Sequence, residues 1–456
     1  QWGVWEGWGT SLCWWAGAYG DREDLADLFF SLKETAVDGT DLVLPGLGLN
    51  IARYNLGGSG FRTYNNTTMQ PSKAIPSWKQ IEGYWQDGES ADPASPSWNW
   101  TADAVQMKML QAAKERGATH LELFSNSPMW WMLSNHNPSG SADGKSDNLA
   151  PDQYENFALY MATVAAQAKE RFGLEFTSVE PVNEPIAGWW KADNGQEGCH
   201  FDHDSQAKIL GMVRDELDNK GLAHVAVSGS DENTYDEALA TWKSFSMVTK
   251  AKVQKVNVHG YEQALGRRDL LYKATLGKRL WNSEYGEGDE TGMSLARNLV
   301  LDFAWLHPVA WVYWQVLDGS GWGLIASDDG ARKLGAVATK YHVLAQYSRH
   351  IREGMTILDN DDHNTVVAYD SKEGKLVLVT VADLWENTIT YDLSAFGAVK
   401  GPVTRWVTNT AGAARYEKHT DLTVQGKKLI VKLDKKTIQT VEIQGVSFAE
   451  ERIFFA

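Results

Sequence analysis

The chain has 456 residues, and its 59 Asp and Glu against 43 Lys and Arg give a formal charge of −16. This charge argues against nucleic-acid and anionic-membrane partners, because both surfaces are negative. No apolar run approaches the roughly 20 residues that a membrane helix needs. The 21 Trp outnumber both the 16 Tyr and the 14 Phe, and such an excess indicates either a large aromatic core or flat platforms for ligands such as sugar rings.

Short apolar runs alternate with helical patterns over residues 1–347. Eight strands are predicted, at Gly7–Trp15, Leu49–Leu56, His120–Ser125, Phe176–Val182, His224–Ser230, Lys255–His259, Arg279–Ser283 and Trp311–Val316. Helices are predicted between most of them, for example at Ala102–Arg116, Pro151–Phe172, Ser205–Asn219 and Leu295–Leu306. Strands separated by helices pair in parallel, so the pattern predicts an α/β fold, a (β/α)8 TIM barrel with enlarged loops. An open doubly wound sheet is the competing fold, but no Gly-x-Gly-x-x-Gly stands at an early strand-to-helix turn.

Residues 348–456 have a different pattern, in which Val, Thr, Ile and Leu alternate with polar residues and turns. This pattern is typical of an antiparallel β-sandwich of about 100 residues. The sequence therefore predicts two domains, a catalytic barrel at 1–347 and a β-sandwich at 348–456. The N-terminal residues could complete one edge of that sandwich, and the last ten residues fit neither pattern.

Two glutamates stand at the ends of predicted barrel strands, Glu184 after the fourth and Glu284 after the seventh. A barrel carries its active site where its strands end, so these carboxyl groups are expected to face each other. Two facing carboxyl groups with aromatic walls are typical of glycoside hydrolysis, in which one protonates the leaving oxygen and the other attacks the anomeric carbon or activates water. Glu180, Glu122, Glu287 and Asp318 are weaker candidates by position alone.

The neighbours of these two glutamates suit the same chemistry. Asn183 can hydrogen-bond a sugar hydroxyl, and Arg53 and Tyr261 can bond Glu284 and keep its pKa low, so that it stays a nucleophile. Trp130 and Trp314 offer ring faces to sugars. Each residue also has a structural interpretation, because Arg53 could serve an ion pair and the two tryptophans could belong to the core.

Most tryptophans precede residue 345, and many lie where a predicted strand ends. We expect about half of the excess to face the substrate rather than fill the core. The tryptophans at or just past strand ends are Trp14, Trp15, Trp130, Trp131, Trp189, Trp190, Trp311, Trp314 and Trp322.

Other features bear on cofactors and location. The run His200–Asp204 is rich in metal-ligand residue types, but its spacing matches no common zinc motif, so no metal is predicted. Cys13 and Cys199 are the two cysteines, and the sequence leaves a bridge between them open. Glycosylation triplets begin at Asn65, Asn66 and Asn99, and they favour a secreted glycoprotein. We also expect the protein to be a monomer.

Several runs resemble glycoside hydrolase family 30. They are Glu6–Trp15, Arg53-x-Asn55-x-Gly57-Gly58, Leu123–Met132, Asn135–Gly140, Asn183-Glu184-Pro185, His259-Gly260-Tyr261 and Glu284. The likeness covers most of the barrel and is greatest with the fungal-type endo-β-1,6-galactanase branch of the family. It implies hydrolysis with retention, without a cofactor, by Glu184 as acid/base and Glu284 as nucleophile. It also implies that a set of residues lines the subsite nearest the cleaved bond, namely Arg53, Trp130, Asn183, His259, Tyr261 and Trp314.

The resemblance makes a polysaccharide or oligosaccharide the expected partner, with β-1,6-galactan of arabinogalactan side chains as the first candidate. A related family activity on xylan, glucuronoxylan or β-1,6-glucan is the alternative, because loops shape substrate choice more than the barrel does. A non-catalytic carbohydrate-binding protein is the third hypothesis. The presence of both glutamates argues against it, since binding alone does not need that pair.

Overall fold

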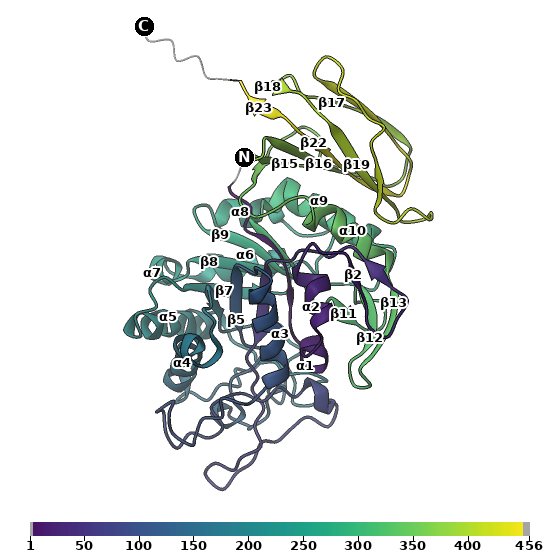
Figure 1. Ribbon diagram of the computed structural model, residues 1–456. Helices are drawn as coiled ribbons and strands as arrows, with labels where there is room; N and C mark the ends of the chain where they lie inside the picture. Colours follow the sequence, from purple (N-terminus) through teal and green to yellow (C-terminus); the bar gives the residue numbers. More distant parts are fainter. Residues whose placement is uncertain (1–2, 450–456) are drawn as a thin grey trace.

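Eight parallel strands close into a barrel, in the order β1-β10-β9-β8-β7-β6-β5-β4 (Figure 1). The computed structural model describes residues 3–449. The barrel strands are β1 (Gly7–Ser11), β4 (Ile51–Asn55), β5 (His120–Phe124), β6 (Ser178–Glu180), β7 (Ala226–Glu232), β8 (Lys255–His259), β9 (Arg279–Tyr285) and β10 (Ala310–Tyr313). Nearly every residue in them is buried, as expected where helices cover a parallel sheet. The predicted (β/α)8 fold is confirmed.

Helices surround the barrel and connect its strands (Figure 1). They are α1 (Trp15–Tyr19), α2 (Glu23–Phe30), α3 (Ala104–Glu115), α4 (Tyr154–Phe172), α5 (His203–Asn219), α6 (Tyr235–Ser244), α7 (Met247–Lys252), α8 (Arg268–Ala274), α9 (Met293–Leu301) and α10 (Thr339–Ser348). Short helical turns lie at Ser77–Lys79 and Trp130–Met132, and a π-helical turn at Asp302–Leu306 continues α9. No described helix has the length and apolar character that crossing a membrane would need.

The first predicted strand is too long. β1 ends at Ser11, and Trp15 already begins α1. The physical reason is a side chain that follows the neighbouring strand β10: the amide oxygen of Gln315 accepts hydrogen bonds from the backbone N–H groups of Trp14 (2.8 Å) and Trp15 (3.3 Å). These donors therefore turn away from the strand ladder.

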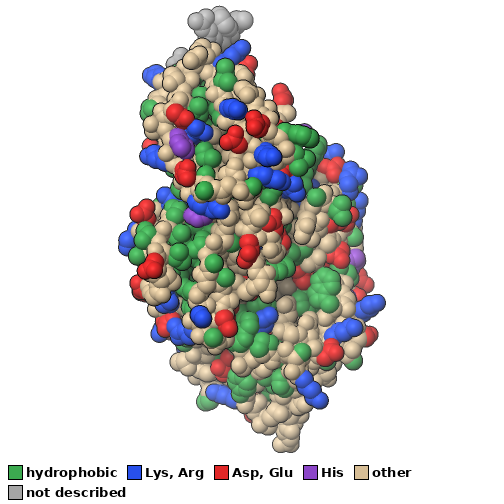
Figure 2. Space-filling model, turned by 90° about the vertical axis from the view of Figure 1, so that its right-hand side faces the viewer, with side chains coloured by type: hydrophobic (Ala, Val, Ile, Leu, Met, Phe, Trp, Pro, Cys, Tyr) green, Lys and Arg blue, Asp and Glu red, His purple; other side chains and the backbone are tan. Residues whose placement is uncertain are grey.

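Antiparallel strands form a second, smaller lobe beside the barrel (Figures 1 and 2). A six-stranded sheet has the order β14-β15-β16-β22-β19-β20, and two-stranded pairs β17-β21 and β18-β23 lie with it. The strands are β14 (Thr356–Leu358), β15 (Thr365–Asp370), β16 (Lys375–Ala382), β17 (Asn387–Asp392), β18 (Phe396–Val399), β19 (Val403–Asn409), β20 (Glu417–His419), β21 (Lys428–Leu433), β22 (Thr437–Ile443) and β23 (Val446–Phe448). The predicted C-terminal sandwich is thereby confirmed.

Small sheets decorate the barrel. One pairs β2 (Thr35–Ala36) with β3 (Val43–Leu44), and another joins β11 (Leu317–Asp318), β12 (Ile325–Asp328) and β13 (Lys333–Val337). The N-terminal segment also reaches the sandwich, because Val4 forms an antiparallel bridge with Thr356 of β14. This contact lies before β1, at the amino ends of the barrel strands, so the sandwich leaves their carboxyl ends free.

Candidate active site

An open cleft lies at the carboxyl ends of the barrel strands, where (β/α)8 barrels build their active sites. Its volume is about 630 Å³. Aromatic, amide and carboxyl side chains dominate its wall, a combination that offers both stacking faces and hydrogen bonds to a polar ligand. The lining residues are Asn126, Asn183, Glu184, Trp189, Trp190, Asn194, Gln196, Asn233, Tyr261, Gln263, Glu284, Gly286, Glu287, Gly288, Trp314 and Trp322.

Glu184 and Glu284 meet in this cleft, as the sequence predicted. Glu184 lies in the loop after β6, and Glu284 lies in β9. An oxygen of each carboxyl group and a ring nitrogen of His259 all lie within 4.8 Å of one another. Because the two glutamates are only 7% and 5% exposed, their charges interact strongly through a medium that contains little water.

Hydrogen bonds fix the carboxyl group of Glu284. The Tyr261 hydroxyl donates to its Oε1 at 2.8 Å, and Nη1 of Arg53 donates to its Oε2 at 3.4 Å. Burial nevertheless raises the pKa of Glu284 to about 7, with the charge of Glu184 adding to the rise and those of His259 and Arg53 opposing it. The expected lowering of this pKa is therefore wrong in direction: both predicted partners are present, but desolvation outweighs them.

Arg53 is a completely buried ion-pair centre. Its Nε donates to Glu122 at 2.9 Å, its Nη1 donates to the backbone oxygen of Ser283 at 3.0 Å, and its Nη2 donates to Asp231. Burial favours the neutral form, but the carboxylates of Asp231, Glu122 and Glu284 outweigh it and raise the pKa of the guanidinium. Arg53 thus ties strands β4, β5, β7 and β9 together below the cleft.

His259 links the two glutamates from below. Its Nδ1 lies 3.0 Å from Oε1 of Glu184, and its Nε2 lies 3.3 Å from Asp231 and 3.5 Å from Glu284. Burial lowers the pKa of the ring, but the carboxylates of Glu284 and Asp231 raise it well above its ordinary value. The ring is therefore an imidazolium, whose Nδ1 donates to Glu184 and whose charge forms ion pairs with Asp231 and Glu284.

The structure divides the six predicted subsite residues into two groups. Asn183, Tyr261 and Trp314 line the cleft, as predicted. Arg53, Trp130 and His259 are 0% exposed and lie behind its wall, which corrects the expectation that they line it. Arg53 and His259 instead contact the two carboxyl groups.

The weaker carboxyl candidates lie elsewhere or are engaged. Glu180 is completely buried below the cleft, where burial and nearby carboxylates raise its pKa well above the ordinary value. Glu122 is buried among Arg53, Ser178 and Lys255. Glu287 lines the cleft. Asp318 accepts a hydrogen bond from Gln315 at 3.0 Å.

The tryptophans at strand ends also divide. Trp189, Trp190, Trp314 and Trp322 line the cleft, and Trp14 supports the Trp314 ring edge-to-face at a centroid distance of 5.4 Å. The expected substrate-facing position is wrong for the others, which are at most 4% exposed and belong to the hydrophobic core: Trp15, Trp130, Trp131 and Trp311.

Sequence reasoning missed two residues that contact the glutamates, Asp231 and Asn233. The backbone N–H of Glu184 donates to the backbone oxygen of Asp231 at 2.8 Å. The side-chain amide of Asn233 donates to Oε1 of Glu184 at 2.8 Å. The predicted fifth strand stops at Ser230, whereas β7 runs to Glu232. The polar run Asp231–Asn233 at the end of this strand was the signal in the sequence that could have pointed to both residues.

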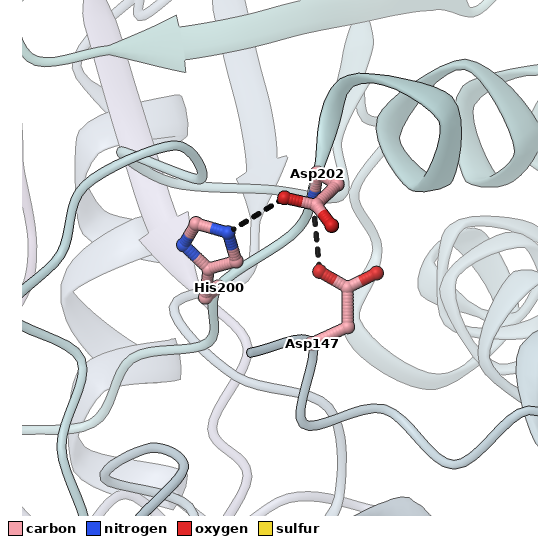
Figure 3. Close-up of side chains that lie close together, drawn as sticks. All are labelled: Asp147, His200 and Asp202. Atoms are coloured by element: carbon pink, nitrogen blue, oxygen red, sulfur yellow. Dashed lines mark hydrogen bonds and ion pairs between the residues drawn. The ribbon is translucent and has the colours of Figure 1, made fainter. Parts of the chain in front are cut away.

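A second group of metal-ligand residue types lies away from the cleft, at Asp147, His200 and Asp202 (Figure 3). Asp147 accepts hydrogen bonds from the backbone N–H of Asp202 at 2.7 Å and from the Ser205 hydroxyl, so it ties its loop to the start of α5. His200 donates from Nδ1 to the Ala187 carbonyl at 3.0 Å, and its Nε2 lies 3.1 Å from Asp202. These contacts give the polar side chains of the His200–Asp204 run a structural role. The absence of a metal stays a prediction.

Cys13 and Cys199 are both buried free thiols. The bridge that the sequence left open therefore does not join them. Burial, the largest cause, raises the pKa of Cys199 to about 12, which keeps it an unreactive thiol.

A closed (β/α)8 barrel that presents two adjacent carboxyl groups in an aromatic cleft defines a glycoside hydrolase. Comparison with known sequences identifies the group: the profile described as O-glycosyl hydrolase family 30 matches residues 2–245. The chain belongs to glycoside hydrolase family 30.

Relatives agree with this assignment. The chain is 50% identical over 451 residues to an endo-β-1,6-galactanase of Hypocrea rufa, covering 98% of this chain and 93% of that protein. Solved structures share the fold at low identity. A conserved exported protein from Bacteroides fragilis superposes with a TM-score of 0.75 at 17% identity, over 97% of this chain and 98% of that one. The catalytic domain of xylanase C from Talaromyces cellulolyticus gives 0.72 at 17% identity over the same shares.

Proposed function

We propose that this enzyme is a retaining endo-β-1,6-galactanase that cleaves β-1,6-linked galactan, such as the side chains of arabinogalactan. The observation that carries the proposal is the 50% identity, over 98% of this chain, to a relative with that activity. The open cleft agrees with it, because a polymer can lie across an open cleft and be cut within the chain.

The spacing of the carboxyl groups supports retention of configuration. Retaining enzymes hold the two groups about 5–5.5 Å apart, whereas inverting enzymes need about 6.5–9.5 Å to admit a water. Oxygens of Glu184 and Glu284 within 4.8 Å of each other suit the shorter distance.

The reaction proceeds in two displacements. Glu184 transfers a proton to the glycosidic oxygen as that bond breaks, while a Glu284 oxygen bonds the anomeric carbon. Glu184 then takes a proton from water, whose oxygen displaces Glu284 and releases the sugar. Tyr261 holds the attacking carboxylate in place through its 2.8 Å bond, and no step needs a cofactor.

The cleft offers further groups to the sugar. Asn183 directly precedes Glu184, and its buried Oδ1 has no hydrogen-bond partner among the described residues, which leaves it free to accept from a sugar hydroxyl. Trp314 presents its ring at the cleft wall, where it can stack on the apolar face of a sugar ring.

The experiment is a product analysis with purified enzyme on β-1,6-galactan, xylan and β-1,6-glucan. We expect a series of galacto-oligosaccharides from the galactan and, by NMR, a β-anomer as first product. Glu284→Gln, which keeps the shape of the side chain but removes the nucleophile, should lower kcat by at least about 10³-fold with unchanged folding. Products from xylan or β-1,6-glucan alone would contradict the proposed substrate.

The setting of the enzyme is also part of the proposal. We infer a secreted, monomeric glycoprotein without nucleic-acid or membrane partners. Asn65 and Asn66 are exposed at a tight turn, and Asn99 is half-buried with Thr101 folded back onto its side-chain oxygen at 2.7 Å. Mass spectrometry of protein secreted by a eukaryotic host would detect sugar at these sites, and unmodified peptides at all of them would contradict the glycoprotein inference.

A further inference from the structure

The end of strand β7 holds the loop that carries Glu184. Glu184 has a φ of 45° and Asp231 a φ of 57°, both in the left-handed region that residues with a Cβ rarely adopt. The 2.8 Å bond from the Glu184 N–H to the Asp231 oxygen joins these two turns. Glu232 extends the connection, since its Oε2 accepts from the N–H of Ile186 at 3.3 Å.

Other groups fix the remaining polar atoms of Glu184. Nε1 of Trp190 donates to its backbone oxygen at 2.9 Å. Asn233 and His259 both donate to the same carboxyl oxygen, Oε1, at 2.8 Å and 3.0 Å. Among the described residues Oε2 receives no such bond, so the two oxygens of this carboxyl group are not equivalent.

This asymmetry decides where a proton can reside. An oxygen that faces two N–H donors has its lone pairs directed at them and cannot itself carry a hydrogen toward either. The other oxygen, Oε2, is free to bind the proton. Because Glu184 lines the cleft, a proton on Oε2 can be donated to an oxygen of the bound substrate.

We infer that Asn233 is a positioning residue that, together with His259, keeps the acid proton of Glu184 on Oε2 and directs it at the leaving oxygen. This inference rests on the proposed function. In the first displacement the Oε2–H bond breaks as the leaving oxygen gains the proton and the glycosidic bond opens. In the second, Oε2 takes a proton from the attacking water, while Oε1 stays bonded to Asn233 and His259 throughout.

The test uses leaving groups of different basicity. A good aryl leaving group departs without a proton, whereas an alcohol or sugar needs one. We therefore expect Asn233→Ala to lower kcat/KM about 10- to 100-fold on a β-1,6-galactobioside with an alkyl or sugar leaving group. With 2,4-dinitrophenol as leaving group the change should stay below about 3-fold. Glu184→Ala should show the same pattern more strongly.

The pH profile provides a second readout. An N–H donor stabilises a carboxylate more than it stabilises a carboxylic acid, so its removal lets Glu184 hold its proton to higher pH. The basic limb of kcat/KM should therefore move upward in Asn233→Ala, and further in Asn233→Asp, whose side chain has the same shape and no N–H donor but adds a negative charge beside Glu184. Asn156→Ala is the control, because Asn156 lies on α4 and its amide donates to Gln153 at 2.9 Å.

Other outcomes would overturn the inference. Equal losses on both leaving groups, or a loss confined to KM, would mean that Asn233 binds substrate directly. An unmoved basic limb in both variants would mean that it does not act through Glu184. If wild type releases nothing from β-1,6-galactan, the proposed function fails separately, and the same comparison is made on aryl and alkyl glycosides of the sugar that it does cleave.

Discussion

Buried carboxyl groups give individual residues of this enzyme a marked dependence on pH. Glu232 and Glu197 are each 1% exposed. Burial, the largest cause, raises the pKa of Glu232 to about 8 and that of Glu197 to about 7. An unfolded glutamate releases its proton near pH ~4.3, so between these values the folded state holds protons that the unfolded state has lost. The stabilisation is complete below about pH 4 and is lost as the pH rises through 7 to 8.

We expect the thermal unfolding midpoint to fall as the pH rises from 4 to 8. Glu232→Gln should reduce that fall, because its amide oxygen can accept from Gln206 and Thr241 as Oε1 of Glu232 does but the side chain cannot ionise. Calorimetry across this range measures the slope, and Glu34→Gln, at an exposed position, should leave it unchanged. A slope in Glu232→Gln as steep as in wild type would contradict the assignment.

At the scale of elements, the loop after β4 shows why glycines stand at positions 57 and 58. A Cβ on Gly57 would lie 1.9 Å from the backbone oxygen of Ile81, and one on Gly58 would lie 2.4 Å from that of Pro128. The two glycines thus let the loop after β4 pass between two other backbone segments. The N–H of Gly58 also donates to Glu197 at 3.2 Å, which secures the crossing.

Gly58→Ala should lower the free energy of unfolding by about 1–3 kcal/mol, because a backbone atom must move to admit the methyl group. Gly17→Ala is the matched control, since Gly17 lies in α1 and a Cβ there would meet no atom within 4 Å. It should be neutral or stabilising by up to about 1 kcal/mol. Denaturant titration compares the two, and equal stabilities would refute the steric argument.

On the scale of the whole molecule, the barrel and the sandwich share one buried interface. Gln346 of α10 is 0% exposed. Its side-chain oxygen accepts from the N–H of Thr440 at 3.1 Å, and its amide donates to the Thr408 hydroxyl at 2.9 Å. One apolar cluster continues from the barrel helices into the face of the six-stranded sheet that packs against the barrel, so the lobes should unfold together.

Gln346→Leu should destabilise the protein by about 1–3 kcal/mol, because it removes the hydrogen bonds that the Gln346 side chain makes to buried groups of Thr440 and Thr408. KM and kcat at 25 °C should not change, since the interface lies away from the cleft. Gln70→Leu, at an exposed site, serves as control. A loss of activity in folded Gln346→Leu would show that the sandwich acts on the cleft, which contradicts this arrangement.

The two glutamates and the three subsite residues at the cleft wall could be predicted because each stands directly after or within a strand. The chain order of strands determines which loops meet at the mouth of a barrel. Arg53 could be placed beside Glu284 for the same reason. The complete burial of Arg53 could not be predicted, because it depends on the contacts that Glu122 and Asp231, from two other strands, make with the guanidinium.

The sequence by itself determined the barrel, the sandwich and the two carboxyl groups, since strand and helix periodicity and strand-end motifs are local properties of the chain. Only the tertiary structure decided which tryptophans face the cleft, that burial raises the pKa of Glu284 to about 7, and that Asn233 holds Oε1 of Glu184. These features depend on distances and solvent exclusion between segments far apart in sequence. The same limit applies to the excess of tryptophan, whose division between core and cleft is set by how the loops, turns and strands that carry these side chains pack together.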